Sequence, residues 1–279
     1  QIAPADKKIY ALRDVTATTE NIGLITSSIM SKKLAAGADA IVLDVKCGSG
    51  AFMKTRESAE ELAGWMVDIG RADGRRMIAV ISDMNQPLGN AVGNSLEVQE
   101  ALDVLKGRGP EDIRELSLTL AGAMIFLGGI ADTMEEGRKL ADEAIRDGRA
   151  LEKFRQFVAN QGGNPDIAED YSLLPQAEFR REVKAAADGF VAELDALGIG
   201  MASKYAGAGR ERKEDEIDMA AGIVLHRKIG DRVAEGDVLC TVYSSDGERA
   251  AAGAAEAAKA FVIKEKCDGI PALGKQIIQ

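Results

Sequence analysis

The sequence predicts an α/β protein in three parts: part of a small helical domain, then a mainly parallel sheet flanked by helices, then a small β-rich C-terminal unit. Two apolar runs rich in β-branched residues, at 40–45 and 77–82, alternate with segments of helical periodicity, which is typical of a parallel α/β sheet. After Pro165 the chain is rich in glycine and in short alternating segments, which favours a separate β unit. We therefore expect the three parts at 1–36, 37–170 and 175–279.

The first part is predicted to be mostly helical over residues 5–36. Ile22, Ile25 and Ile29 recur at helical spacing, and Gly37 follows the last helical residues as a stop signal. The next apolar run, at 40–45, is predicted to be a buried strand.

The predicted sheet alternates with helices. A capping-box pattern at 58–61 predicts the start of the helix that separates the two strands, and a second such pattern begins at Thr133. Helical periodicity predicts further helices at 94–106, 111–130, 154–162 and 250–260. The β-rich unit is expected to contain strands at 189–194, 222–226 and 238–243.

Composition and charge exclude several classes of protein. The 279 residues include 35 Lys and Arg against 45 Asp and Glu, and this net charge of −10 argues against a protein that coats nucleic acid or anionic membranes. The longest nearly apolar stretch, at 116–131, is shorter than the ~18–20 residues that span a bilayer. The cysteines are too few and scattered for a disulfide framework, which favours a reducing, cytoplasmic setting. The single histidine, His226, lies in an apolar stretch and is expected to be structural.

The glycine turn at 44–52 is the first candidate for ligand contact. Glycines after a parallel strand let the backbone approach a ligand at the carboxyl end of that strand. The turn also approximates a Walker A loop, but Met53 stands where that loop requires glycine, which disfavours a nucleoside triphosphatase. An ordinary structural turn explains the same residues.

The second candidate combines Arg13, Ser28 and Lys32. Ser28 and Lys32 are four residues apart, so a helix places them on one face. A guanidinium, a hydroxyl and an ammonium suit a planar ligand that has several carbonyls and a ring N–H. Spacing alone is equally compatible with a solvated helix face.

The third candidate is the turn at 88–91 followed by Glu100. Backbone carbonyls in a turn and a nearby carboxylate can hold a hard cation through oxygen. An ordinary loop and helix start explains this pattern as well.

Several long blocks in order along the chain resemble one known family. The blocks are residues 4–16 (Pro-Ala-Asp-Lys-Lys-Ile-Tyr-Ala-Leu-Arg-Asp-Val-Thr), 27–33 (Ser-Ser-Ile-Met-Ser-Lys-Lys), 44–53, 82–88, 207–210 and 230–233. Together they resemble the pyrimidine-nucleoside and thymidine phosphorylases, and the first two are most similar to the pyrimidine-nucleoside branch. The resemblance covers essentially the whole chain.

The resemblance implies reversible phosphorolysis, in which phosphate attacks a pyrimidine nucleoside such as uridine, thymidine or deoxyuridine and yields free base and (deoxy)ribose 1-phosphate. Arg13 and Lys32 would then be catalytic and would hold the pyrimidine edge together with Ser28. The residues around the base would be Tyr10, Ile25 and Phe52. The resemblance further implies that the complete enzyme is a homodimer. From the cysteines and the net charge we also expect a cytoplasmic setting and no nucleic-acid or membrane partner.

The same resemblance implies a potassium site. The carbonyls of Leu88 and Ala91 and the carboxylate of Glu100 would supply part of its ligands. The family's remaining ligands and its phosphate-binding loop lie in an earlier segment, which we expect upstream of Gln1, so the chain alone is expected to be inactive.

Two other readings remain open at the level of sequence. The chain could be a non-catalytic fragment or interaction module that lacks the phosphate loop. The region 222–243 also resembles a biotinyl or lipoyl barrel faintly, although no Lys in a tight hairpin presents an attachment site.

Overall fold

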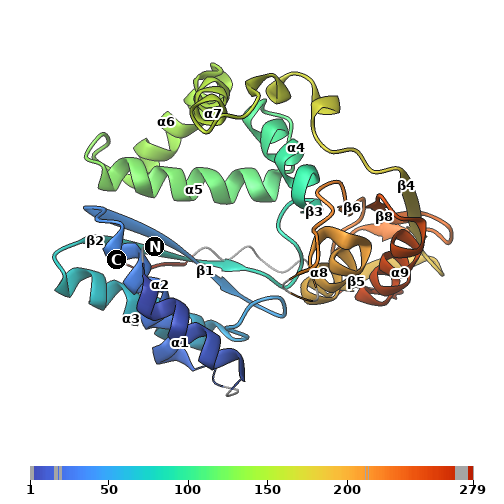
Figure 1. Ribbon diagram of the computed structural model, residues 1–279, viewed down its shortest axis with the longest axis horizontal. Coiled ribbons are helices and arrows are strands. Elements are labelled where there is room, and N and C mark those ends of the chain that lie inside the picture. Colours follow the sequence, from blue (N-terminus) through green and yellow to red (C-terminus); the bar gives the residue numbers. More distant parts are fainter. Residues whose placement is uncertain are drawn as a thin grey trace. The chain divides into compact units, whose positions relative to one another are not determined.

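The structure is a computed structural model that describes residues 3–15, 18, 21–210, 212, 214–267 and 276–278 (Figure 1). The chain forms two compact units. The first unit comprises residues 1–83, 116–141 and 273–279, and the second comprises 84–115 and 142–272. The three successive parts expected from the sequence remain a prediction about domain organisation, since the compact units are interleaved along the chain.

The first unit is built on a parallel strand pair, as the sequence predicts. β1 (Ala40–Cys47) and β2 (Arg76–Asp83) pair in parallel over their whole length, and β10 (Gln276–Ile278) adds an antiparallel strand on the other edge of β2. Parallel strands need a long crossover connection, and here α3 (Arg56–Ala72) supplies it and packs on both strands. The mixed α/β class is therefore confirmed, with β10 as an unpredicted antiparallel addition.

Two helices precede the sheet. α1 (Pro4–Val15) and α2 (Ile22–Ala35) correspond to the helical segment predicted over 5–36. The side chain of Asn21 caps α2 by accepting a hydrogen bond from the backbone N–H of Leu24 at 3.1 Å. The helix ends just before Gly37, whose φ of 73° is the left-handed conformation of a C-terminal glycine stop.

The start of α3 differs from the prediction. The helix begins at Arg56 and is capped by Thr55, whereas the sequence pattern placed the cap at Ser58. Thr55 is extended and its side chain accepts the Ser58 N–H at 3.3 Å, while the Ser58 side chain faces the backbone of Thr55. Because the Thr55 side chain already caps the helix by accepting the Ser58 N–H, Ser58 becomes the third residue of the helix rather than its cap.

One face of the parallel pair forms the core of the first unit. The residues of this core come from α2, α3 and alternate positions of the two strands, and include Met30, Leu62, Met66, Val67, Ile41, Leu43, Val45, Met77, Ala79 and Ile81. Because side chains alternate along a strand, the other face of β1 carries Asp44 and Lys46. The hydrophobic face thus fixes where these polar side chains lie.

The second unit contains two antiparallel sheets. One has the order β3 (Ala91–Gly93), β6 (Gly222–Leu225), β8 (Val238–Ser244), β4 (Phe179–Lys184), and the other has the order β7 (Arg232–Val233), β5 (Gly189–Leu194), β9 (Phe261–Lys264). Two helices pack with these strands, α8 (Ala196–Ser203) and α9 (Gly247–Ala257). The three predicted strands of the β-rich unit are confirmed, and the helix predicted at 250–260 corresponds to α9 and the short 3-10 turn after it.

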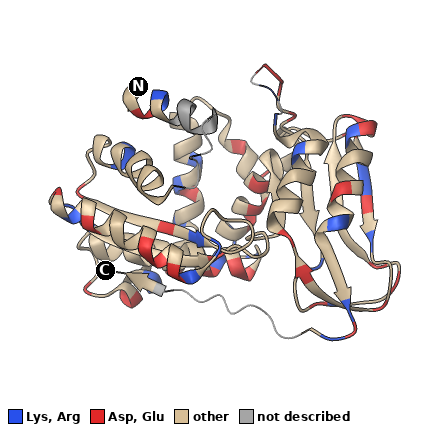
Figure 2. Cartoon of the chain, turned by 90° about the horizontal axis from the view of Figure 1, so that it is seen from below, with Lys and Arg blue, Asp and Glu red and all other residues tan. Residues whose placement is uncertain are grey.

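The remaining helices also correspond to predicted segments. They are α4 (Asn94–Leu105), α5 (Glu111–Leu127), α6 (Met134–Arg146) and α7 (Arg149–Asn160). α5 is shorter than the predicted segment 111–130, because the chain turns at Gly129 with a φ of 72°. None of the described helices combines the length and apolarity needed to cross a membrane. Acidic and basic residues are interspersed along the elements (Figure 2).

Within the first unit, α5 and α6 approach closely at two glycines. A Cβ built on Gly122 would lie 2.8 Å from the carbonyl oxygen of Met134 and 2.8 Å from the backbone nitrogen of Arg138. On the facing helix, a Cβ on Gly137 would lie 2.5 Å from the carbonyl oxygen of Gly122. These contacts are with backbone, which cannot rotate away, so the crossing requires glycine.

We therefore expect Gly122→Ala to lower the free energy of unfolding by about 1–3 kcal/mol through overpacking. Gly64→Ala is the matched control, because Gly64 also lies in a helix but nothing lies within 4 Å of an added Cβ there. That control should be neutral or more stable by about 0.5–1 kcal/mol. Denaturant unfolding of both variants checks this, and equal effects at the two positions would contradict the close helix crossing.

Candidate functional site

The predicted pair Ser28 and Lys32 is brought together on α2. The Lys32 ammonium donates to the Ser28 hydroxyl oxygen at 2.8 Å and lies 2.6 Å from a carboxylate oxygen of Asp6 on α1. Ser28 is buried, whereas the Lys32 side chain is 47% exposed. A lysine ammonium has three hydrogens, and these two oxygens account for two of them, so the ammonium is held in place yet reachable from solvent. Sequence reasoning missed Asp6.

Of the other predicted base-contact residues, only Ile25 and Phe52 have side chains that the structure describes. Ile25 lies in the hydrophobic core of the first unit rather than at a surface. Phe52 projects from the glycine turn with its side chain 64% exposed. Tyr10 and Arg13 belong to α1, but their side chains lie outside the described part of the chain. The roles implied for these four residues therefore remain predictions.

A polar cluster lies beside the glycine turn, at the carboxyl ends of β1 and β2. The Lys46 ammonium is 2.7 Å from a carboxylate oxygen of Asp44 and donates to the Ser82 hydroxyl oxygen at 3.0 Å, while that hydroxyl donates to the other Asp44 oxygen at 2.5 Å. Gly48 has a φ of 133°, which lets the chain turn back so that its N–H meets the Met53 carbonyl at 3.0 Å. Met53 is buried in the core, so its side chain is needed where a Walker A loop has glycine.

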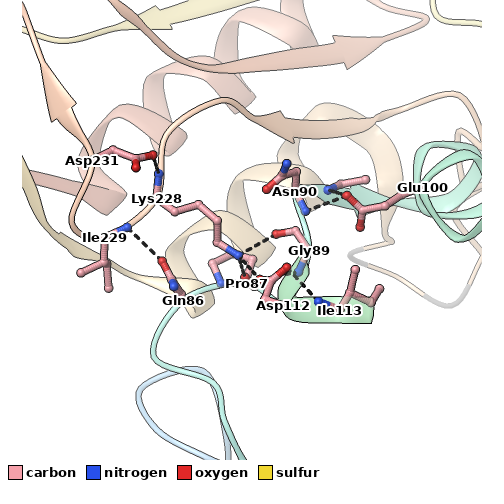
Figure 3. Close-up of polar contacts among 11 residues, drawn as sticks. Gln86, Pro87, Gly89, Asn90, Glu100, Asp112, Ile113, Lys228, Ile229 and Asp231 are labelled. Carbon is pink, nitrogen blue, oxygen red and sulfur yellow. Dashed lines mark hydrogen bonds and ion pairs between the residues drawn. The ribbon is translucent and has the colours of Figure 1, made fainter. Parts of the chain in front are cut away.

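In the second unit, the turn at 88–91 wraps around Glu100 of α4 (Figure 3). One carboxylate oxygen of Glu100 accepts the N–H groups of Asn90 at 2.7 Å and Ala91 at 3.0 Å. A Cβ on Gly89 would lie only 2.1 Å from the other carboxylate oxygen, so the backbone passes directly over this side chain. Glu100 as a whole residue is 9% exposed, and the structure thus brings it together with the turn that the sequence predicted.

Lys228 completes this cluster. Its ammonium donates to the carbonyl oxygens of Pro87 at 2.8 Å and Gly89 at 2.9 Å, and forms an ion pair with Asp112 of α5. Asp112 also accepts the Gly89 N–H at 3.1 Å. Sequence reasoning missed Lys228 and Asp112, because no local pattern links positions so far apart.

The negative charge of Glu100 is only partly balanced by positive charge in the cluster. Burial raises the pKa of Glu100, the two backbone N–H bonds oppose that rise, and the neighbouring charge of Asp112 adds to it. Lys228 acts in the opposite direction, but its ammonium is in direct contact with Asp112. A positive charge near Glu100 would therefore be favourable.

The single histidine and the cysteines behave as structural residues. His226 bonds through its Nε2 to the Thr241 hydroxyl oxygen at 2.8 Å, and desolvation together with the charge of Arg227 lowers its pKa. Cys240 is fully buried, and burial raises the pKa of its thiol to about 12. Burial also raises the pKa of Cys47, and the negative charges of Asp83 and Glu57 add to this.

Since the thiolate is the reactive form, we expect iodoacetamide in mildly alkaline buffer to leave Cys240 unmodified and to modify Cys47 slowly. The raised pKa lowers the thiolate fraction of both cysteines in the folded chain. Mass spectrometry of tryptic peptides measures this, and the same reaction in denaturant serves as the control, where both should react. Rapid labelling of Cys240 in the native chain would contradict its placement in the core.

Comparisons with known proteins agree with this fold. A family model described as the glycosyl transferase family, a/b domain, matches residues 1–151, and one described as the pyrimidine nucleoside phosphorylase C-terminal domain matches residues 190–264. The pyrimidine-nucleoside phosphorylases of Staphylococcus aureus strains USA300 and bovine RF122 / ET3-1 are 59% and 60% identical to this chain over 244 residues. The match covers 88% of this chain and 56% of each relative, so the chain spans about half the length of these relatives.

The fold and the first of these matches place the chain in the glycosyl transferase family, a/b domain. With the second match and the relatives taken together, the chain belongs to the pyrimidine-nucleoside phosphorylase family.

Proposed function

We propose that this chain carries the base-binding part of an enzyme that catalyses the reversible phosphorolysis of pyrimidine nucleosides, with uridine, thymidine and deoxyuridine as substrates. The relatives are named as pyrimidine-nucleoside phosphorylases, which supports this reaction class. The observation that carries the proposal is the pair of Ser28 and Lys32, in which a buried hydroxyl and an accessible ammonium lie 2.8 Å apart on one helix face.

The chemistry of the reaction explains why such a pair is useful. When the bond between sugar and base breaks, the sugar gains positive charge and the departing pyrimidine gains negative charge on its carbonyl oxygens. A fixed ammonium near those oxygens stabilises the transition state more than the neutral ground state, which is the requirement for catalysis. In our proposal Lys32 has this role together with Arg13, and Ser28 orients the ring N–H edge.

Asp6 sets the position of the Lys32 ammonium before the base binds. Its carboxylate lies 2.6 Å from the ammonium, on the neighbouring helix α1. The ion pair and the Ser28 hydrogen bond restrict the flexible lysine side chain to one region, so less conformational entropy is lost when a base is bound.

We expect Lys32→Ala to weaken the binding of free uracil by about tenfold to a hundredfold, because a charge-assisted hydrogen bond is lost. Lys33→Ala is the matched control, since Lys33 is the adjacent residue of the same helix and is exposed. Calorimetric titration of uracil into the chain and both variants checks this. Equal affinities in the wild type and the Lys32 variant would contradict the base-binding role.

A phosphorolysis assay on the same chain separates the enzyme from the alternative, a binding or interaction module. The chain spans about half the length of its relatives, and we propose that it binds the base without turnover unless the rest of the enzyme is supplied. Adding the unmatched part of the S. aureus relative, as a fusion, should restore turnover of uridine if the chain is the base-binding part.

We further propose a monovalent cation, potassium, at Glu100 with the carbonyls of Leu88 and Ala91. Carbonyl and carboxylate oxygens are the ligand types that hold potassium in proteins. The structure offers a buried carboxylate whose pKa is raised and a turn wrapped closely around it, which fits a single positive charge. The bound cation would hold the turn and neutralise this carboxylate.

We expect KCl to raise the melting temperature of the chain more than tetramethylammonium chloride at the same ionic strength, and Glu100→Gln to abolish the difference. Only the small cation can enter an oxygen-lined site, and the neutral amide removes its charge partner. Glu97→Gln is the matched control on the same helix, because a glutamine oxygen can still accept the Gly93 N–H that Glu97 binds at 2.8 Å. Identical effects of the two salts on the wild type would contradict the cation site.

A further inference from the structure

The environment of Lys228 resembles that of a bound cation. Three oxygens surround its ammonium: the carbonyls of Pro87 and Gly89 at 2.8 and 2.9 Å, and a carboxylate oxygen of Asp112 (Figure 3). An ammonium has three hydrogens, so donors and acceptors match one to one. The side chains of Lys228 and Asp112 are only 19% and 21% exposed, which limits screening of this pair by solvent.

The backbone that carries Lys228 is itself fixed. Its own N–H donates to a carboxylate oxygen of Asp231 at 2.8 Å, which closes the turn after β6. The next N–H, of Ile229, donates to the side-chain oxygen of Gln86 at 3.0 Å. The ammonium is therefore positioned from both ends, by the turn that carries it and by the oxygens that it contacts.

The same oxygens belong to the turn that covers Glu100. Pro87 and Gly89 accept from Lys228 through their carbonyls, while the Gly89 N–H donates to Asp112. The next two N–H groups, of Asn90 and Ala91, donate to Glu100. The turn thus contacts the Lys228–Asp112 pair through residues 87–89 and Glu100 through the two residues that follow.

The charges of the cluster differ between the Lys228–Asp112 pair and Glu100. Among the groups shielded from solvent, Glu100 and Asp112 contribute two negative charges, and Lys228 contributes one positive charge that contacts Asp112 directly. The carboxylate of Asp231, which accepts the Lys228 N–H, belongs to an exposed residue and is screened by solvent. One negative charge remains, on the buried carboxylate of Glu100. A single monovalent cation balances this remainder, whereas a divalent cation would exceed it.

We propose that Lys228 is a positioning residue: its ammonium is a built-in cation that neutralises Asp112 and fixes the carbonyls of Pro87 and Gly89, so that Glu100 alone attracts an exchangeable monovalent cation. This inference rests on the cation site in the proposed function and assigns its geometry to a residue 139 positions beyond Gly89. It also links the β-rich part of the second unit, through the turn after β6, to that site.

The test is a double variant, Asp112→Asn with Lys228→Met. It removes one negative and one positive charge, so the net charge near Glu100 is unchanged and only the positioning is lost. We expect the KCl concentration for half-maximal thermal stabilisation to rise by about tenfold to a hundredfold, as for other residues that orient ligands of a bound ion. We also expect the amide hydrogens of Gly89, Asn90 and Ala91 to exchange faster, while amides of α9 keep their protection.

The matched control is Glu193→Gln with Lys264→Met, which removes an exposed ion pair of the same unit and should leave both readouts unchanged. If the double variant does not fold, Lys228→Arg takes its place, because a planar guanidinium keeps the charge but cannot place one compact donor among three oxygens. An unchanged KCl midpoint or unchanged exchange of the three amides overturns the role of Lys228. A wild-type chain that is indifferent to KCl instead overturns the cation site itself.

Discussion

The parallel register of β1 and β2 is the constraint on which the first unit depends. Eight residue pairs join the strands, from Ala40 opposite Arg76 to Cys47 opposite Asp83. This register sends Ile41, Leu43 and Val45 with their partners toward α2 and α3, and sends Lys46 to the other face opposite Ser82. A slip by one residue would exchange the two faces. The hydrophobic core and the polar cluster at the carboxyl ends therefore follow from the same pairing.

The sequence predicted the elements whose own residues carry enough signal. Each long strand of the first unit contains the mainly apolar run that predicted it, at 40–45 or 77–82, and the stop at Gly37 is a local conformational requirement. β3, β7 and β10 could not be predicted in this way, because strands of two or three residues show no period and form only when a distant partner is present. The start of α3 was misplaced for a related reason, since two residues with capping side chains stand one turn apart and only the backbone conformation selects Thr55.

The candidate sites likewise contain residues that local spacing predicts and residues that only the folded structure reveals. Ser28 and Lys32 are one helical turn apart, and Glu100 follows its turn closely, so spacing along the chain indicated both groups. The residues that hold them in place come from far away: Asp6 is 26 positions from Lys32, and the Lys228–Asp112 pair beside the Glu100 turn joins residues 116 positions apart. Such partners are selected by the packing of helices and strands, which one sequence does not reveal. Sequence spacing thus identified the residues with candidate roles, and the structure identified the residues that hold them in place.

The net charge of −10 does not decide what these sites bind, because charges beyond about 10 Å are screened at ordinary salt concentrations. The local arrangement does. Lys32, Lys46 and Lys228 each contact one aspartate and at least one neutral oxygen, from Ser28, from Ser82 or from backbone carbonyls. In each case the aspartate forms an ion pair with the ammonium. The neutral oxygen accepts a second hydrogen bond, which restricts the position of the ammonium without adding another negative charge. At Lys228 all three hydrogens of the ammonium are hydrogen-bonded, so the ammonium holds the Pro87 and Gly89 carbonyls and Asp112 in place. Where the side chain stays 47% exposed, as at Lys32, the ammonium can still meet a ligand that develops negative charge.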